Sequence, residues 1–307
     1  MSYTQEVQEF ARKTEGQFSL NFGDFDHSMS KLAKANGGEY TSREELKQKA
    51  AEKAVNVAER GDIDMRPYTM QLNDGHFQAE ISPKVKGLVF VLATLMEVKT
   101  GGNVVDRKYK PLNLKAIAEK IGKSERAIRP VIQEAVSVGM LTEHYKGNGS
   151  EKTYTISDEF YRIGSMGRKS PSYTRVIKSS VREVSKDLSF EDLGYLSELI
   201  NFMHPKYHAL FRNPHEPNAE ALEILRPKDI ENLLGMKKGK GNRFVNALIS
   251  LDILERWETG NRATKQRVKI LLASEEFFSK TTKIVDRKEL KKTISKETAF
   301  SNKNYIK

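Results

Sequence analysis

The apolar and polar positions of this chain follow the same pattern twice. Copy one, from Leu112 to Asn148, reads LNLKAIAEKIGKSERAIRPVIQEAVSVGMLTEHYKGN. Copy two, from Leu225 to Asn261, reads LRPKDIENLLGMKKGKGNRFVNALISLDILERWETGN. The copies lie about 113 residues apart and align without a gap over roughly 37 positions, with Gly122 opposite Gly235. We interpret them as an internal repeat, which constrains the architecture.

Within copy one the apolar spacing predicts two short helices joined by a tight turn. Ile117 and Ile121 are four residues apart and share one helix face. Gly122 can end that helix, because glycine adopts a left-handed backbone at little cost. Ser124 can cap the second helix. Pro130 conflicts with this register, so the second helix is either kinked there or begins near Arg129.

After its second helix, each copy shows alternating apolar residues on either side of a glycine-rich tip. The tips are Gly147-Asn148-Gly149 in copy one and Gly260-Asn261-Arg262 in copy two. This pattern is typical of a β-hairpin. Tyr145 and Trp257 lie on the predicted strands, where such aromatic rings either stack on bases or pack on the helix beneath.

The start of the second helix is more basic in copy two. The run from Lys237 to Arg243, KKGKGNR, contains four basic residues and no acidic residue. One interpretation is a solvated loop. The other is a phosphate contact, in which backbone amides and basic side chains approach the nucleic acid at a helix start.

These patterns predict a mainly α fold with small β-hairpin wings, an α+β chain with two winged helix-turn-helix domains in tandem. We expect leading helices at Val85–Lys99 and Phe190–Met203, and N-terminal helices near Gln5–Lys13 and Ser42–Glu59. The expected domain layout is a polar, partly helical extension at 1–83, winged-helix domains at 84–165 and 188–280, a basic linker at 166–187 and a lysine-rich tail at 281–307.

Charge changes the functional picture more than the rest of the composition. The chain has 52 Lys and Arg against 41 Asp and Glu, a formal net charge of +11. Such a field attracts polyanions, although a generic basic protein would carry it too. The absence of cysteine excludes disulfides, thiol catalysis and cysteine zinc fingers. With no apolar run near 18 residues and a polar N-terminus, we expect a cytoplasmic protein without a membrane span or signal peptide.

Enzymatic motifs are weak. The run from Gly235 to Lys240 lacks the spacing and the hydroxyl residue of a Walker phosphate loop, and no histidine pair near a tyrosine suits a nicking enzyme. His204, His208 and His215 could share a metal, but Pro205 and Pro214 argue against a continuous helix there. We expect surface or half-buried histidines. A second cluster, Asp24, Asp26 and His27, is better explained as a solvated loop. We expect no catalytic activity, cofactor or metal.

At this point the chain resembles the replication initiators of bacterial plasmids and phages, which carry tandem winged-helix modules in basic chains of similar length. The end of copy one, Tyr154-Thr155-Ile156-Ser157 followed by Phe160 and Gly164, is similar to the winged-helix core of small initiators of Gram-positive plasmids. The similar stretch of copy two is Val268-Lys269-Ile270 followed by Phe277-Phe278. The resemblance covers residues 84–280. It implies that the second module reads repeated origin sites, while the first makes dimer and DNA contacts.

The sequence therefore predicts a double-stranded DNA-binding protein. Origin-binding initiation and transcriptional regulation at a promoter or operator both fit, and a structural or partition adaptor is a third class. A homodimer and host replication or transcription proteins are conceivable partners, whereas a membrane is not expected. The predicted DNA-facing residues are Ser124, Arg126, Arg129, Gln133, Lys146, Lys152, Lys237, Lys238, Lys240, Asn242, Arg243, Asn246, Arg262 and Lys265.

Overall fold

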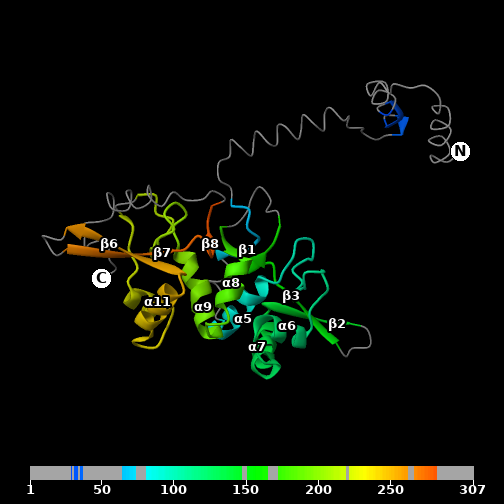
Figure 1. The fold of residues 1–307 in the computed structure, drawn as a ribbon, viewed down its shortest axis with the longest axis horizontal. Coiled ribbons are helices and arrows are strands. Elements are labelled where there is room, and N and C mark those ends of the chain that lie inside the picture. The colour runs from blue at the N-terminus through cyan, green and yellow to red at the C-terminus, as the bar shows by residue number, and fades with distance from the viewer. Residues whose placement is uncertain are drawn as a thin grey trace. The chain divides into compact units, whose positions relative to one another are not determined.

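The computed structural model describes residues 64–73, 81–146, 151–164, 172–218, 221–261 and 266–281, with six further positions between 29 and 36. The chain divides into two units, Met1–Asp62 and Ile63–Lys307. All elements below belong to the second unit (Figure 1). The helices expected at Gln5–Lys13 and Ser42–Glu59, and almost all of the expected tail, lie outside the described residues.

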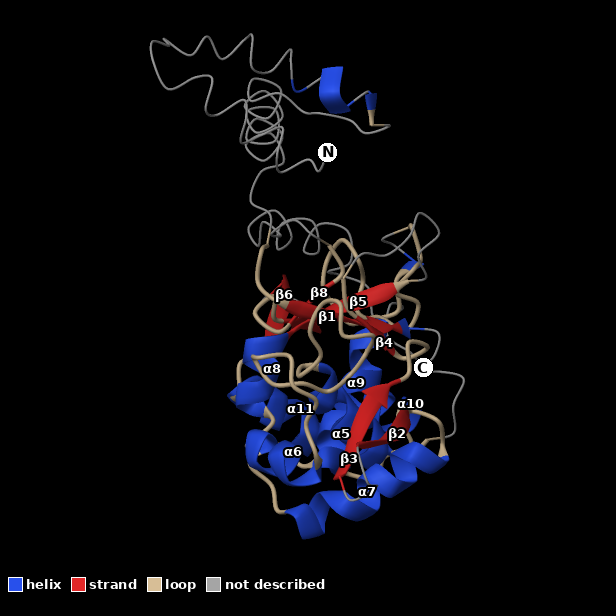
Figure 2. Cartoon of the chain, turned by 90° about the vertical axis from the view of Figure 1, so that its right-hand side faces the viewer, coloured by secondary structure: helices blue, strands red, loops and turns tan. Residues whose placement is uncertain are grey.

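A four-stranded antiparallel sheet joins segments that are far apart in the sequence. Its order is β4-β1-β5-β8, formed by β1 (Tyr68–Leu72), β4 (Tyr161–Arg162), β5 (Tyr173–Ile177) and β8 (Phe278–Ser279). In the central pair Met70 lies opposite Arg175. Figure 2 shows this sheet on one side of the second unit, with helices packed below it.

The strand pairing extends the repeat beyond the two copies. β1 pairs with β4 through Gln71 and Tyr161, and β5 pairs with β8 in the same register through Val176 and Phe278. The antiparallel β1–β5 pair therefore relates two halves, residues 64–164 and 172–281, by an approximate twofold axis. Even the sequences agree, since β1 and β5 both begin with Tyr-Thr.

Two leading helices cross beneath this sheet at a pair of glycines. α5 (Pro83–Ala93) and α9 (Phe190–Leu199) are each preceded by a serine N-cap. A Cβ on Gly87 would overlap the carbonyl oxygen of Phe190, and a Cβ on Gly194 would overlap that of Pro83. The contact is thus reciprocal, and the helix backbones touch directly at the approximate twofold axis.

Copy one folds as two helices followed by a hairpin. α6 (Leu114–Ile121) ends at Gly122, whose φ of 66° is left-handed, and α7 (Glu125–Ser137) follows. Ser124 caps α7 by accepting a hydrogen bond from the amide of Ala127. α7 continues through Pro130, so the register that begins at Ser124 is correct; proline there only removes the bond to the Arg126 carbonyl. β2 (Leu141–Lys146) and β3 (Glu151–Ile156) form the hairpin.

The second half repeats this order. α8 (Lys178–Val184) precedes α9, the 3-10 helix η1 (Ile200–Phe202) extends it, and α10 (Pro227–Leu233) and α11 (Lys240–Ser250) form the helix pair. β6 (Leu254–Asn261) and β7 (Gln266–Ala273) form the hairpin. The expected tip of the first hairpin, 147–149, lies outside the described residues, as does Arg262 of the second tip.

One continuous core spans both halves. It includes Val89 and Ile128 of the first half and Leu196 and Leu248 of the second, all fully buried. A smaller cluster around Phe211 and Ile270 lies beneath the second hairpin. The two halves therefore share this core.

The expected fold class is wrong. The described residues contain eight strands, and the four that form the sheet were not expected, so the fold is an α+β unit and not a mainly α tandem of winged helix-turn-helix domains. β1 lies inside the supposed polar extension, and β5 and α8 lie inside the supposed linker. Their sequences concealed them because buried strand positions are occupied by polar residues such as Thr69, Gln71 and Arg175.

Replacing Gly87 or Gly194 with alanine should destabilise the whole unit. The added methyl group meets a backbone carbonyl that cannot move away by a rotamer change, so we expect a loss of about 3 kcal/mol or more in unfolding free energy. Urea denaturation monitored by circular dichroism measures this loss. Gly101→Ala is the control: its Cβ would meet nothing within 4 Å, and its φ of 61° should cost only about 1–2 kcal/mol. Equal losses in the three variants would contradict the glycine contact.

Candidate nucleic-acid interface

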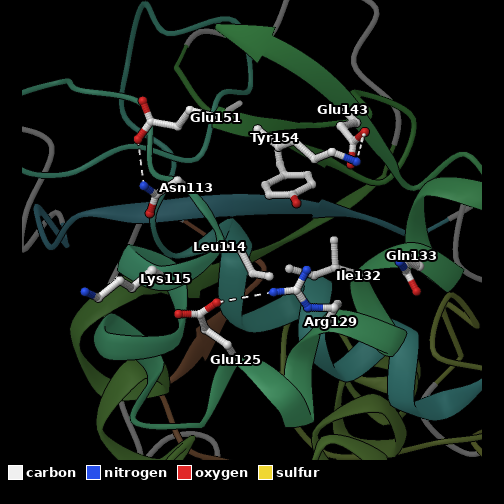
Figure 3. A pocket seen from close by; sticks show the side chains of 11 residues that line it. Asn113, Leu114, Lys115, Glu125, Arg129, Ile132, Gln133, Glu143, Glu151 and Tyr154 are labelled. Atoms are coloured by element: carbon white, nitrogen blue, oxygen red, sulfur yellow. Dashed lines mark hydrogen bonds and ion pairs between the residues drawn. The ribbon is translucent and has the colours of Figure 1, made fainter. Parts of the chain in front are cut away.

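A groove of about 310 Å³ lies between α7 and the hairpin of copy one. Figure 3 shows Arg129 and Ile132 of α7 on one side and Tyr154 and Glu143 of the hairpin on the other, with Asn113 and Glu151 at one end. Gln133 also lines the groove. The structure thus brings three of the predicted copy-one residues, Arg129, Gln133 and Lys152, to one concave surface.

The charges of this groove are largely paired. Arg129 lies 3.4 Å from Glu125, and Lys152 lies 2.9 Å from Glu143. The Lys152 ammonium lowers the pKa of Glu143 from its usual value, chiefly through that hydrogen bond. At the groove's end Asn113 donates a hydrogen bond of 2.6 Å to Glu151. Sequence reasoning missed Glu143 and Glu151, whereas Glu125, four residues before Arg129 on the helix, was a readable signal that this arginine is partly neutralised.

Two predicted residues of copy one keep exposed side chains. Arg126 and Gln133 lie on the solvent face of α7, and no hydrogen bond or ion pair joins either to another described residue. Ser124 is used as the helix cap. Copy one therefore offers one unpaired cation and one amide on α7, a weaker polyanion surface than its sequence suggests.

In copy two, Lys240 is committed to the fold. Its ammonium lies 3.0 Å from Glu191 and 3.2 Å from Asp192, and 4.7 Å from the ring centre of Tyr195. The pKa of Glu191 is lowered, mainly by its hydrogen bond with Lys240. Because all three partners belong to α9, Lys240 ties the start of α11 to the leading helix and does not point freely into solvent.

The backbone at the start of α11 is also occupied. Glu231 of α10 accepts a hydrogen bond of 2.9 Å from the amide of Gly241. Backbone hydrogen bonds from Gly241 and then Gly239 lower the pKa of Glu231. The amides of Gly239 and Gly241 are therefore engaged by Glu231 and are not available to a phosphate.

Those side chains form an exposed basic set. Lys237, Lys238, Asn242 and Arg243 are exposed, and their side chains form no hydrogen bond or ion pair with another described residue. Asn246 is exposed one turn further along α11, where Arg256 of β6 donates a 3.0 Å hydrogen bond to its carbonyl oxygen. Figures 1 and 2 show α7 and α11 on the side of the molecule away from the four-stranded sheet. We call this set, Lys237, Lys238, Asn242 and Arg243, the α11 surface.

The hairpins give a mixed result. The side chain of Lys146 and all of Arg262 and Lys265 lie outside the described residues. Trp257 packs against the smaller hydrophobic cluster beneath the second hairpin. Tyr145 is 62% exposed, so its ring does not pack on the helix beneath.

Two of the histidines considered as metal ligands, His204 and His208, are instead packed inside the protein. The Nδ1 atom of His204 accepts the backbone amide of Lys206 at 3.1 Å, and its ring stacks on Tyr207 with centres 4.6 Å apart. His208 is 1% exposed and His204 8% exposed, so these rings are more buried than expected. Among the described residues no three His, Asp or Glu side chains are grouped as a metal site. Asp24, Asp26 and His27 lie outside the described residues.

Burial makes these two histidines acid-sensitive. Desolvation lowers the pKa of both to about 4, with Lys280 and the neighbouring histidine adding to the effect for His208. Unfolded chains bind protons near pH 6.5, so stability is complete above that pH and falls as the pH drops toward 4.

Between pH 7 and pH 5 we expect His208 to account for a loss of roughly 2 kcal/mol in unfolding free energy. His208→Asn, which tolerates the left-handed φ of 53°, should weaken this pH dependence in urea titrations. His144→Asn on the exposed face of β2 is the control. An unchanged pH dependence in His208→Asn would show that this ring is accessible to protons.

Comparison with known proteins identified no relative of this chain. No protein-family model matches the chain, and no curated protein matches it either. Within the part of the chain that the structure describes, no helix is both long and apolar enough to span a membrane.

Proposed function

We propose that this protein binds double-stranded DNA, with α11 as the dominant reading helix and α7 as a weaker one. The observation that carries the proposal is the α11 surface. It presents three cations and an amide, all exposed, on the start of a helix and the turn before it. Cations at such positions suit phosphate oxygens, and Asn and Arg on a helix suit base edges in a major groove.

The internal symmetry supports a single extended DNA site. The β1–β5 pairing and the α5–α9 contact are both reciprocal, so α7 and α11 occupy equivalent positions about the approximate twofold axis. One chain would then contact two segments of one duplex in opposite orientation. The copies would contribute unequally, because Arg129 and Lys152 are paired with acids whereas the α11 surface is not.

For the biological role we propose an origin-binding initiator of plasmid or phage type, without catalytic activity, acting in the cytoplasm. Two reading helices in one chain favour an initiator, because a regulator with one reading helix per chain would obtain the second helix by forming a dimer. Sequencing the genomic sites that the protein occupies tests this role. Several copies of its site, repeated in the same direction near its own gene, would support it, whereas a single copy over a promoter would replace it with transcriptional regulation.

Duplex binding should weaken steeply with salt. Each neutralised phosphate should add about −0.9 to the slope of log affinity against log salt concentration, because condensed counterions are released on binding. Anisotropy titrations with a duplex selected from a random pool measure the slope. A slope near zero would contradict the proposal.

The substitutions Lys237→Ala and Arg243→Ala together should weaken duplex binding more than Arg126→Ala with Arg129→Ala. Both pairs remove two charges, but Glu125 already offsets part of the charge of Arg129. The slope should become shallower by about 1.8 for the α11 pair if both side chains contact phosphates. The opposite order of affinities on the same duplex would identify α7 as the dominant helix.

Lys240→Ala separates folding from binding. Because Lys240 contacts Glu191, Asp192 and Tyr195, its loss should lower stability and leave the salt slope close to that of the parent protein. A large change in slope with unchanged stability would instead make Lys240 a DNA contact.

A further inference from the structure

A five-residue turn before α6 is fixed by one carboxylate. The side chain of Asp106 accepts the amides of Lys108 at 2.7 Å and Lys110 at 2.9 Å. The backbone of Asp106 also accepts the amide of Tyr109 at 3.0 Å and donates to Lys110 at 2.9 Å. The amide of Lys110, and to a lesser extent that of Lys108, donates to the Asp106 carboxylate and holds its pKa below the usual value. The turn is therefore a closed, pre-organised loop.

This turn projects one aromatic ring among three cations. Arg107, Lys108, Tyr109 and Lys110 are all exposed, and Tyr109 is 61% exposed. Within the described part of the chain none of the three cations forms an ion pair. With Asp106 counted, the turn carries an excess of two positive charges. Burial lowers the pKa of Arg182 of α8, and the positive charge of Arg107 lowers it further, whereas Glu97 opposes this shift.

Tyr109 is held in a costly backbone conformation. Its φ is 62°, a left-handed value that bulky residues rarely adopt. Glycine or asparagine would fit the turn more readily. Strain of this kind persists where the surrounding structure enforces it and often marks a binding position.

The ring of Tyr109 borders a shallow cavity of about 410 Å³. Val98, Val105 and Pro111 give it apolar walls, and Val98 is 48% exposed. Lys99 adds a further cation, at a residue whose φ of 69° is also left-handed. An exposed ring, an apolar wall and flanking cations thus lie together.

This site shares no residue with the groove of copy one. β2 pairs with one edge of β3, while residues 103 and 113 bridge to Thr155 and Thr153 on the other edge. The turn 106–110 is the loop of chain between these two bridges, which are formed by residues 103 and 113. It therefore lies on the edge of β3 that faces away from β2, and a ligand there need not compete with one bound in the groove.

We propose that the turn 106–110 and its cavity bind an unpaired nucleic-acid strand, with a base stacked on Tyr109 and phosphates held by Arg107, Lys108 and Lys110. Stacking on an aromatic ring beside cations is how proteins bind single strands without reading their sequence. A duplex would not expose the face of an internal base. The site goes beyond duplex binding by α7 and α11 and does not depend on it.

The turn's own hydrogen bonds favour a nucleic acid over an acidic peptide. The amides of Lys108, Tyr109 and Lys110 all donate to Asp106. An extended peptide gains much of its affinity from main-chain hydrogen bonds, and these donors are no longer free to supply them. Stacking and phosphate contacts need only the ring face and the cations.

The test uses the full chain and a fluorescein-labelled oligothymidine of about 20 nucleotides, a length that covers one typical single-strand site. Tyr109→Asn removes the ring but suits the left-handed backbone, so the turn should still form. We expect it to weaken oligothymidine binding about tenfold. Tyr109→Phe keeps the ring and should bind like the parent. Photocrosslinking to 5-bromouracil, read by mass spectrometry, should label Tyr109 in the parent chain.

Charge is tested by a matched pair of double variants. Arg107→Ala with Lys108→Ala should make the single-strand salt slope shallower by about 1.4. Lys84→Ala with Lys186→Ala removes the same charge from exposed positions elsewhere and should leave the slope unchanged. Equal effects of the two pairs would overturn the site, because they would reduce it to overall charge.

Duplex binding measured on the same variants separates the two proposals. Tyr109→Asn should leave duplex affinity intact, and Lys237→Ala with Arg243→Ala should leave Tyr109 crosslinking intact. Unchanged oligothymidine binding in Tyr109→Asn would overturn the single-strand site while leaving duplex binding standing. If a polyglutamate peptide displaces the oligothymidine from the parent at equal concentration but not from Tyr109→Asn, the site would belong to an acidic protein partner and the proposal would fail.

Discussion

The structure depends on the direct contact between the backbones of α5 and α9 at Gly87 and Gly194. No side chain can be inserted there, because each Cα lies against a carbonyl oxygen of the opposite helix. Such close approach permits Cα–H to carbonyl contacts and tight packing of the residues on either side. The two leading helices therefore cross at a fixed point, and everything that packs on them, including α7 through α5, takes its position from that crossing.

Around this contact the two halves differ in chemistry while keeping the same topology. In one place Tyr161 donates to Gln71, and the amide of Gln71 donates to the Ser197 carbonyl at 2.6 Å and to Asn201 at 3.0 Å. In the equivalent place Val176 and Phe278 are apolar, and Phe278 packs on Phe90 with ring centres 6.2 Å apart. A buried polar network is favourable only when each member has its partner, so the halves cannot exchange roles freely.

The same divergence separates the two candidate surfaces. In copy one, Glu125 and Glu143 pair with Arg129 and Lys152, so the positive charge of α7 and its neighbouring hairpin is largely neutralised. The second half uses its acids to hold the fold, as Glu231 of α10 holds the start of α11 and Glu191 of α9 holds Lys240. Its remaining cations consequently stay exposed. Net charge alone could not distinguish these cases, because it does not show which acids and bases are paired in the folded chain.

The sequence by itself determined the local elements of both copies: Gly122 and Gly235 as helix ends, Ser124 as a cap, and alternating residues as hairpins, because each depends on neighbours a few residues away. Arg126, Gln133 and Arg243 were likewise predicted to face DNA, and all three side chains are exposed. Only the tertiary structure decided the sheet, since β1 and β5 are buried by contacts about a hundred residues apart and accommodate polar residues such as Gln71, whose side chain is hydrogen-bonded to Ser197 and Asn201. It also decided that Lys240 is a structural residue and that Tyr109 stands exposed in a strained turn, because burial and pairing are properties of the packed chain.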